Sequence, residues 1–121
     1  MSASAILLLA HGSKDPKWKL PFAAILESAR GQSTKTIELA FLESMSPDFD
    51  AGIDLLVDAG AREVRVIPLF LAAGSHVRAD LPRLIEQALQ RHPNLRIDAV
   101  PAIGEIAEIQ QAIAAYAVRA S

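Results

Sequence analysis

Ala5-Ile6-Leu7-Leu8-Leu9-Ala10 is an unbroken apolar run that is followed directly by His11-Gly12-Ser13. Such a run predicts a β-strand that is covered on both faces, as strands of parallel sheets are. The imidazole of His11 then stands where the buried strand gives way to a loop. Residues 64–71 form a second apolar run, and Gly74-Ser75-His76 follows it. Two histidines at the carboxyl ends of two such strands can converge on one site, because open α/β sheets bind ligands at that edge.

Four strands are expected along the chain, at residues 5–10, 36–41, 64–71 and 95–100. A stretch with helical spacing follows each of them. Alternating strands and amphipathic helices predict a parallel sheet with helices on both faces and right-handed crossovers. We therefore expect a small three-layer α/β sandwich around a four-stranded parallel sheet.

The helices are predicted from the spacing of their apolar residues and from their end signals. The first covers about residues 16–30, with Phe22, Ile25, Leu26 and Ala29 on one face and Gly31 as its stop. In the second, Ser46 suits the N-cap and Pro47 the first helical position, and Gly60 ends the helix. The third covers about residues 80–91. The last carries a stripe that we expect to join the core, made of Ile106, Ile109, Ile113 and Tyr116.

Composition limits the class of protein. The 121 residues, 51% of them hydrophobic, suffice for one domain with a real core, and no linker divides residues 1–121. A formal net charge of −2 argues against a nucleic-acid surface. The opening residues Met1–Ser4 carry no positive charge, and the apolar run after them is too short for a leader or a membrane span. We expect a cytoplasmic protein that acts without nucleic acid or membrane.

Metal ligation is a further expectation for the edge that carries His11 and His76. The chain has no cysteine, so a metal would be held by histidine, carboxylate or water. Glu43 follows the second predicted strand and falls on the same edge. Two histidines and one glutamate would form an open site for a divalent cation, or the imidazoles would transfer protons. The competing interpretations are histidines that bond loop backbone and an exposed loop acid; His92, before Pro93, is expected to be solvated.

Cationic side chains close to both histidines suggest an anionic ligand. Lys14 and Arg78 are placed to bind carboxylates, whereas Lys17 and Lys19 fit a solvated helix start. Trp18 could belong to the core or line the same cleft. Two familiar sites are excluded by spacing: residues 73–77 lack the flanking glycines of a nucleophile elbow, and residues 12–14 lack the upstream glycine of a phosphate-binding loop.

Three separated motifs occur in one order along nearly the whole chain: Leu9-Ala10-His11-Gly12-Ser13, Ala40-Phe41-Leu42-Glu43 with Pro47 beyond, and residues 68–71 leading to Gly74-Ser75-His76-Val77-Arg78-Ala79-Asp80-Leu81-Pro82. Together they resemble the CbiX/SirB family of class II tetrapyrrole chelatases, in the short single-domain form. The resemblance implies a chelatase-like domain, of the kind that makes up half of a flavodoxin-like pair. Lys14 departs from the pattern, because an arginine often follows His-Gly-Ser.

The resemblance implies the insertion of a divalent metal into sirohydrochlorin, with cobalt favoured and ferrous iron or nickel as alternatives. The metal is then a substrate, and no tightly bound cofactor is expected. By motif, the catalytic and metal-binding roles fall on His11, His76 and Glu43. Substrate binding falls on a set that follows both strands: Ser13, Lys14, Gly74, Ser75 and Arg78. A non-catalytic carrier of metal or tetrapyrrole is the alternative from another class.

A homodimer is expected from the size of the ligand and from the last helix. A tetrapyrrole is large relative to the edge of one such domain, which would supply a single wall of the cleft. The last helix also carries small apolar residues that would admit a partner helix: Ala107, Ala114, Ala117 and Val118. The longer members that this chain resembles look like two such domains in tandem, which a short chain would reproduce by pairing with itself.

Overall fold

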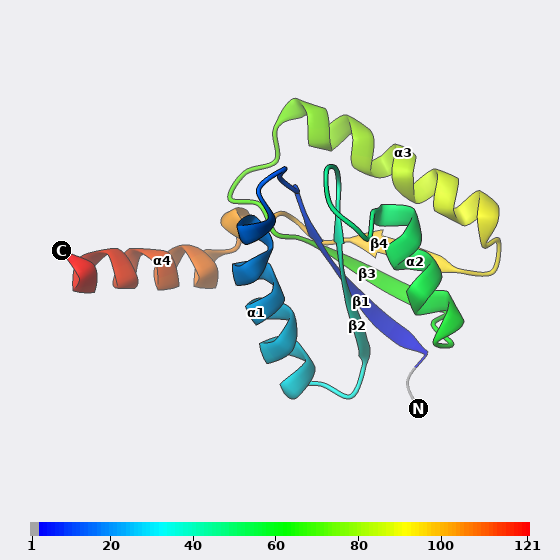
Figure 1. Ribbon diagram of the computed structural model, residues 1–121, viewed down its shortest axis with the longest axis horizontal. Helices are drawn as coiled ribbons and strands as arrows, with labels where there is room; N and C mark the ends of the chain where they lie inside the picture. Colours follow the sequence, from blue (N-terminus) through cyan, green and yellow to red (C-terminus); the bar gives the residue numbers. More distant parts are fainter. Residues whose placement is uncertain (1–2) are drawn as a thin grey trace.

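The computed structural model describes residues 3–121, so residues 1 and 2 of the expected domain lie outside the described residues. Four strands alternate with four α-helices (Figure 1). In chain order the elements are β1 (Ser4–Ala10), η1 (Pro16–Trp18), α1 (Lys19–Gly31), β2 (Thr36–Phe41), α2 (Phe49–Asp58), β3 (Glu63–Pro68), α3 (Ser75–Arg91), β4 (Arg96–Ala99), η2 (Ile103–Glu105) and α4 (Ala107–Ala120), where η marks a 3₁₀ helix.

The strands form one parallel sheet in the order β2-β1-β3-β4, which confirms the predicted fold class. β1 is central and pairs Leu8 with Leu39 on one side and with Ile67 on the other. α1 lies on one face of the sheet, while α2 and α3 lie on the other (Figure 1). This arrangement follows from right-handed crossovers, because the chain moves from β1 to β2 in one direction and then back across β1 to β3.

Alternation along β1 divides the core into two parts. Leu7 and Leu9 are fully buried against α2 and α3, while Leu8 and Ala10 face α1. Trp18 belongs to the α1 side, where its ring lies 4.4 Å from that of Phe22. Trp18 is thus partly buried and packs against the core. Of the stripe expected on α1, Phe22, Leu26 and Ala29 pack against the core, but the prediction for Ile25 is wrong, because it is 43% exposed.

Two helix starts differ from the sequence prediction. Asp48, and not Ser46, caps α2, because its carboxylate accepts a hydrogen bond of 2.9 Å from the Ala51 N–H. α3 begins at Ser75, five residues before the predicted start. β3 ends at Pro68, three residues before the predicted end at Leu71, and the residues between Pro68 and α3 form a loop. The helical start puts His76 on the first turn of α3 and not in a loop.

The last helix contradicts its prediction. α4 packs on neither face of its own sheet and extends away from it (Figure 1). Ile106 and Ile109 are half-buried near η2, but Ile113 and Tyr116 are exposed, so the stripe is not part of the core of this chain. No helix within residues 3–121 is long and apolar enough to cross a membrane.

His92 is also not the solvated residue that its position before Pro93 suggests. Its Nε2 lies 2.8 Å from Oδ1 of Asp54 on α2, and the same oxygen is 2.8 Å from Nη1 of Arg91. These hydrogen bonds, the one from His92 above all, lower the pKa of Asp54 from its ordinary 3.8, against partial burial that raises it. The cluster joins the end of α3 to α2, away from the carboxyl ends of the strands.

Candidate functional site

The carboxyl ends of the strands carry the residues that the sequence singled out. The loops after β1 and β3 leave neighbouring strands toward opposite faces, since α1 covers one face and α3 the other. Open α/β sheets bind ligands at such a switch point. His11 follows β1 directly, and His76 lies on the first turn of α3, which follows the loop after β3, so both histidines stand beside the switch point.

His11 and Glu43 form the one close pair among the predicted site residues. Nδ1 of His11 lies 3.2 Å from Oε1 of Glu43, and both side chains are more than half exposed. The ring of Phe70 approaches His11 edge-on, with 6.4 Å between the ring centroids. When Nδ1 carries a proton, it donates to the carboxylate and leaves the lone pair of Nε2 free. The pair can therefore ligate a cation or accept a proton through Nε2.

Backbone contacts hold this pair together. The Leu42 and Glu43 N–H groups donate to the carbonyl oxygens of Ala10 and His11, which continues the β1–β2 pairing beyond both strands. Gly12 has a φ of 100°, and a Cβ on it would overlap the carbonyl oxygen of Glu43. A glycine is thus required at position 12, because it permits both the left-handed turn and the close approach.

His76 does not join the pair. Its side chain is 97% exposed, and its nearest charged neighbour is Asp80, one turn along α3, with 4.0 Å between Nε2 and Oδ2. In the part of the chain that the structure describes, no three histidine, aspartate or glutamate side chains stand close enough to hold one metal ion. A Cβ added to the preceding Gly74 would meet no atom within 4 Å, so the segment before His76 has room around it.

The predicted substrate-binding residues lie on both sides of the edge. Lys14 and Arg78 are exposed. The Ser13 hydroxyl accepts a hydrogen bond of 3.1 Å from the Asp15 N–H and so shapes the turn before η1. Gly74 is the N-cap of α3, and Ser75 is its first helical residue. The two cations therefore remain available for an anionic ligand, while the serines and Gly74 shape the backbone around the histidines.

Two pockets flank this edge. One, of about 620 Å³, is formed by residues 42–48 and Ala51, so Glu43 is part of its wall. The other, of about 440 Å³, is largely apolar, with Arg78 and Glu105 as its charged residues; the rest of its wall is Pro68, Ala73, Val77, Leu81, Pro82, Ile85, Ala99, Val100, Pro101 and Ala102. The first pocket therefore offers carboxylates at this edge, and the second a largely apolar wall with one cation and one carboxylate.

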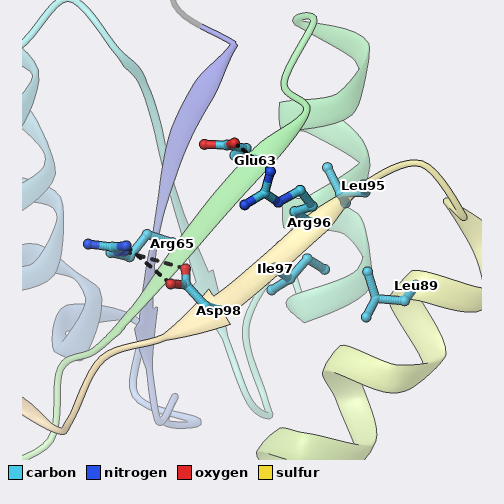
Figure 2. Close-up of a pocket in the computed structure, with 7 residues that line it drawn as sticks. All are labelled: Glu63, Arg65, Leu89, Leu95, Arg96, Ile97 and Asp98. Carbon is cyan, nitrogen blue, oxygen red and sulfur yellow. Dashed lines mark hydrogen bonds and ion pairs between the residues drawn. The ribbon is translucent and has the colours of Figure 1, made fainter.

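A third pocket, of about 420 Å³, is remote from the histidines. It wraps the edge strand β4 near the starts of β3 and β4, and Figure 2 shows its lining residues. Arg65 and Asp98 are paired there, with 3.1 Å between Nη2 and Oδ2. This pocket lies toward the amino ends of the strands and holds no histidine, so we do not assign it to the candidate site.

Sequence reasoning missed two residues that support the site. Phe70 contacts His11, but within an apolar run nothing distinguishes it from core residues. Gly104 N–H donates to the Phe70 carbonyl oxygen, and a Cβ on Gly104 would overlap the backbone of Leu71. The single glycine between Ile103 and Glu105 was the available signal, since an isolated glycine often marks a close backbone approach.

Comparison with known proteins finds relatives that are named as sirohydrochlorin chelatases. The sirohydrochlorin ferrochelatase of Bacillus subtilis is 34% identical over 110 residues, 90% of this chain and 42% of that protein. The sirohydrochlorin cobaltochelatase of Saccharolobus solfataricus is 36% identical over 83 residues, 66% of this chain and 62% of that protein. The match thus spans about two fifths to three fifths of the length of these curated relatives.

Solved structures of similar proteins superpose on nearly the whole of this chain. The CbiX protein from Marinobacter aquaeolei VT8 superposes with a TM-score of 0.86 at 32% identity, over 96% of this chain and 93% of that one. The sirohydrochlorin chelatase SirB from Bacillus subtilis subspecies spizizenii, solved in complex with cobalt, superposes with a TM-score of 0.82 at 33% identity, over 93% of this chain and 48% of that one. The CbiX family model matches residues 5–120, and the chain therefore belongs to the CbiX family.

Proposed function

We propose that this protein inserts a divalent metal ion into sirohydrochlorin. The observation that carries the proposal is the His11–Glu43 pair, at 3.2 Å, on the edge where sheets of this class bind ligands. The named activities of the relatives support the substrate, and they include both iron and cobalt insertion. Cobalt is our first choice of metal. Ferrous iron and nickel are alternatives, because imidazole and carboxylate ligands suit all three ions.

The reaction needs groups that handle both a cation and protons. One M²⁺ enters the macrocycle and two pyrrole N–H protons leave, so charge is conserved. Glu43 accepts the hydrogen bond from Nδ1 of His11 and orients the ring, and Nε2 of His11 then meets the incoming metal or takes a proton. Lys14 and Arg78 would bind the carboxylates of the macrocycle from the two sides of the edge.

His76 completes the proposal as a second imidazole, on the first turn of α3. In the present geometry it stands in solvent, so sharing one metal with His11 requires movement of the segment around Gly74, which has open space around it. A weakly held metal suits transfer to the macrocycle, because a closed set of protein ligands would retain the ion.

Absorbance-monitored metallation of sirohydrochlorin tests the proposal. Co²⁺, Ni²⁺ and Fe²⁺ are supplied in parallel, and the rate is compared with the reaction without protein. We expect a catalysed rate with repeated turnovers, fastest with Co²⁺. A burst that stops at one equivalent of product would indicate a carrier instead, and no rate above the uncatalysed one would refute the chelatase proposal.

We further propose that the working unit is a homodimer, in keeping with a ligand larger than the edge of one sheet. Sedimentation equilibrium at micromolar protein tests this. A monomer that is fully active at the same concentration would refute it.

A further inference from the structure

The loop after β2 carries Glu43 and is closed at its base. The Phe41 N–H donates a hydrogen bond of 2.9 Å to the Pro47 carbonyl oxygen, and Phe41 also forms a bridge to Asp48, the N-cap of α2. A pocket of about 620 Å³ lies against residues 42–48, so one side of this loop is not supported by packing. Contacts elsewhere must therefore hold the carboxylate of Glu43 in position.

Ser44, directly after Glu43, has a backbone conformation that favours glycine. Its φ is 66°, and within residues 3–121 it is the one residue other than glycine with a positive φ. The Met45 N–H donates a hydrogen bond of 2.8 Å to the Glu43 carbonyl oxygen, which makes residues 43–45 a three-residue turn. A side-chain-bearing residue at positive φ is strained and keeps that conformation only where its surroundings hold it. The turn after Glu43 thus depends on contacts from outside it.

Lys19, the first residue of α1, supplies two such contacts. Its Nζ donates a hydrogen bond of 3.2 Å to the Ser46 carbonyl oxygen, and the same ammonium group lies 5.6 Å from the centroid of the Phe41 ring. The first contact holds the second half of the loop, and the second is a cation–π interaction with the residue at its base. The sequence predicts a solvated helix start for Lys19, but the exposed side chain in fact reaches from α1 to the loop after β2.

The loop after β1 fixes the other end of the turn. The Glu43 N–H donates a hydrogen bond of 3.1 Å to the His11 carbonyl oxygen, and Gly12 packs on the Glu43 carbonyl oxygen. With its N–H held in this way, Glu43 keeps its orientation as long as the turn at Ser44 persists. Opening of that turn would rotate the peptide after Glu43 and change the 3.2 Å separation between its Oε1 and Nδ1 of His11.

We propose that Lys19 is a positioning residue for metal insertion: it holds the strained turn at Ser44 and so keeps Glu43 beside His11. The inference rests on the proposed chelatase function and adds a residue to it. The competing role for an exposed cation in this region is to bind the carboxylates of the macrocycle. The two roles differ in their kinetics, because loss of a positioning residue lowers kcat, whereas loss of a cation that binds substrate and transition state alike raises KM.

Steady-state metallation kinetics with Co²⁺ separate the two roles. Lys19→Met keeps an unbranched side chain but removes the donor and the charge, Lys19→Arg keeps both, and Lys17→Met removes a neighbouring exposed charge as the control. We expect Lys19→Met to lower kcat about three- to tenfold with KM changed less than about twofold, and the other two variants to stay within about twofold of wild type. A raised KM with unchanged kcat, an equal loss in Lys17→Met, or no effect of Lys19→Met would overturn the positioning role.

A double-mutant cycle then tests whether Lys19 acts through the turn. Glycine adopts a φ of 66° without strain, so in Ser44→Gly protein the turn no longer depends on Lys19. We expect Lys19→Met to lower kcat by less than about twofold when it is introduced into Ser44→Gly protein, with all variants folded by circular dichroism. A loss as large as in the wild-type background would overturn the proposed route through Ser44.

The ring nitrogens of His11 give a readout that does not depend on chelatase activity. ¹⁵N NMR of histidine-labelled protein distinguishes protonated from unprotonated ring nitrogens, and His11→Ala identifies the signals of His11. We expect the neutral His11 ring to carry its proton on Nδ1 in wild type, where that nitrogen faces Glu43, and to become a mixture of tautomers in Lys19→Met but not in Lys17→Met. Identical spectra of wild type and Lys19→Met would overturn the positioning role. This spectral change in a wild type and variant pair that metallates nothing would support the positioning of Glu43 and refute the chelatase function alone.

Discussion

Gly12 lies in backbone contact with Glu43, at a φ of 100° and with no space for a Cβ beside the Glu43 carbonyl oxygen. We predict that Gly12→Ala destabilises the fold and separates His11 from Glu43. Gly60 is a matched control, because it also has a φ of 100° but nothing within 4 Å of a Cβ. Gly60→Ala should cost about 1–3 kcal/mol from backbone strain alone. Gly12→Ala should cost more in urea unfolding and also lower metallation; equal losses in both variants would contradict the packing argument.

Removal of an imidazole is predicted to abolish most activity without unfolding the protein. His11→Ala and His76→Ala should each reduce the metallation rate about 100-fold or more, since exposed residues at the strand ends contribute little to the core. Glu43→Gln should be milder, because an amide still accepts the hydrogen bond from His11 but carries no charge. His92→Ala serves as the control, since His92 lies away from the edge. Full activity in either site variant would remove that histidine from the mechanism.

The two exposed cations are predicted to act in substrate binding. Lys14→Ala and Arg78→Ala should each raise KM for sirohydrochlorin about two- to fivefold and leave kcat nearly unchanged, because they bind substrate and transition state alike. Lys35→Ala, which removes a charge between α1 and β2 at the other end of the sheet, is the control. Steady-state kinetics with Co²⁺ separate the two parameters. A loss confined to kcat would assign the cations to the chemistry.

Asp48 is predicted to stabilise α2 as its N-cap. Asp48→Ala removes the acceptor for the Ala51 N–H and should lower the free energy of unfolding by about 1 kcal/mol. Ser46→Ala, at the position that the sequence pattern favours, should change it by less than about 0.5 kcal/mol. Thermal unfolding of both variants checks the assignment, which a larger effect at Ser46 would reverse.

The free energy of unfolding is predicted to depend on pH through Asp54. The pKa of Asp54 is lowered in the folded protein, so its stabilisation is present above the ordinary value of 3.8 and is lost as the pH falls through the lowered value. Asp54→Asn should therefore be less stable than wild type at pH 5–7, by less than about 1 kcal/mol because the side chain is half-exposed, and the difference should close below about pH 4. Asp58→Asn, which removes another carboxylate from the same helix, is the control. A gap that does not narrow as the pH falls below 3.8 would contradict the linkage.

Periodicity is sufficient to predict the sheet and most helices. Leu7, Leu8 and Leu9 are buried on alternate faces, which is the condition that an unbroken apolar run describes. Helix starts are less accessible, because both Ser46 and Asp48 are good capping residues and the choice depends on where the backbone leaves β2. The environment of His92 escapes prediction for a similar reason: its partner Asp54 lies 38 residues away in the sequence.

Backbone geometry that the sequence pattern does not reveal also limits the prediction of the candidate site. Spacing places His11, Glu43 and His76 at one edge, but whether the side chains meet depends on loop geometry. The early start of α3 fixes His76 on a helical turn pointing into solvent, while Gly12 draws His11 and Glu43 together. The apolar stripe of α4 predicts burial, but the spacing alone does not reveal that the helix extends away from its own sheet.

The position of β1 at the centre of the sheet has a consequence for biosynthesis. Ala5 pairs with Thr36 and with Val64, so the second of these partners follows it by 59 residues. At about 5–20 residues per second, a ribosome makes those residues in about 3–12 s. Throughout that interval the apolar strand β1 of the nascent chain lacks at least one of its two neighbouring strands. The nascent chain therefore exposes an apolar strand that chaperones can bind before β3 pairs with its second edge.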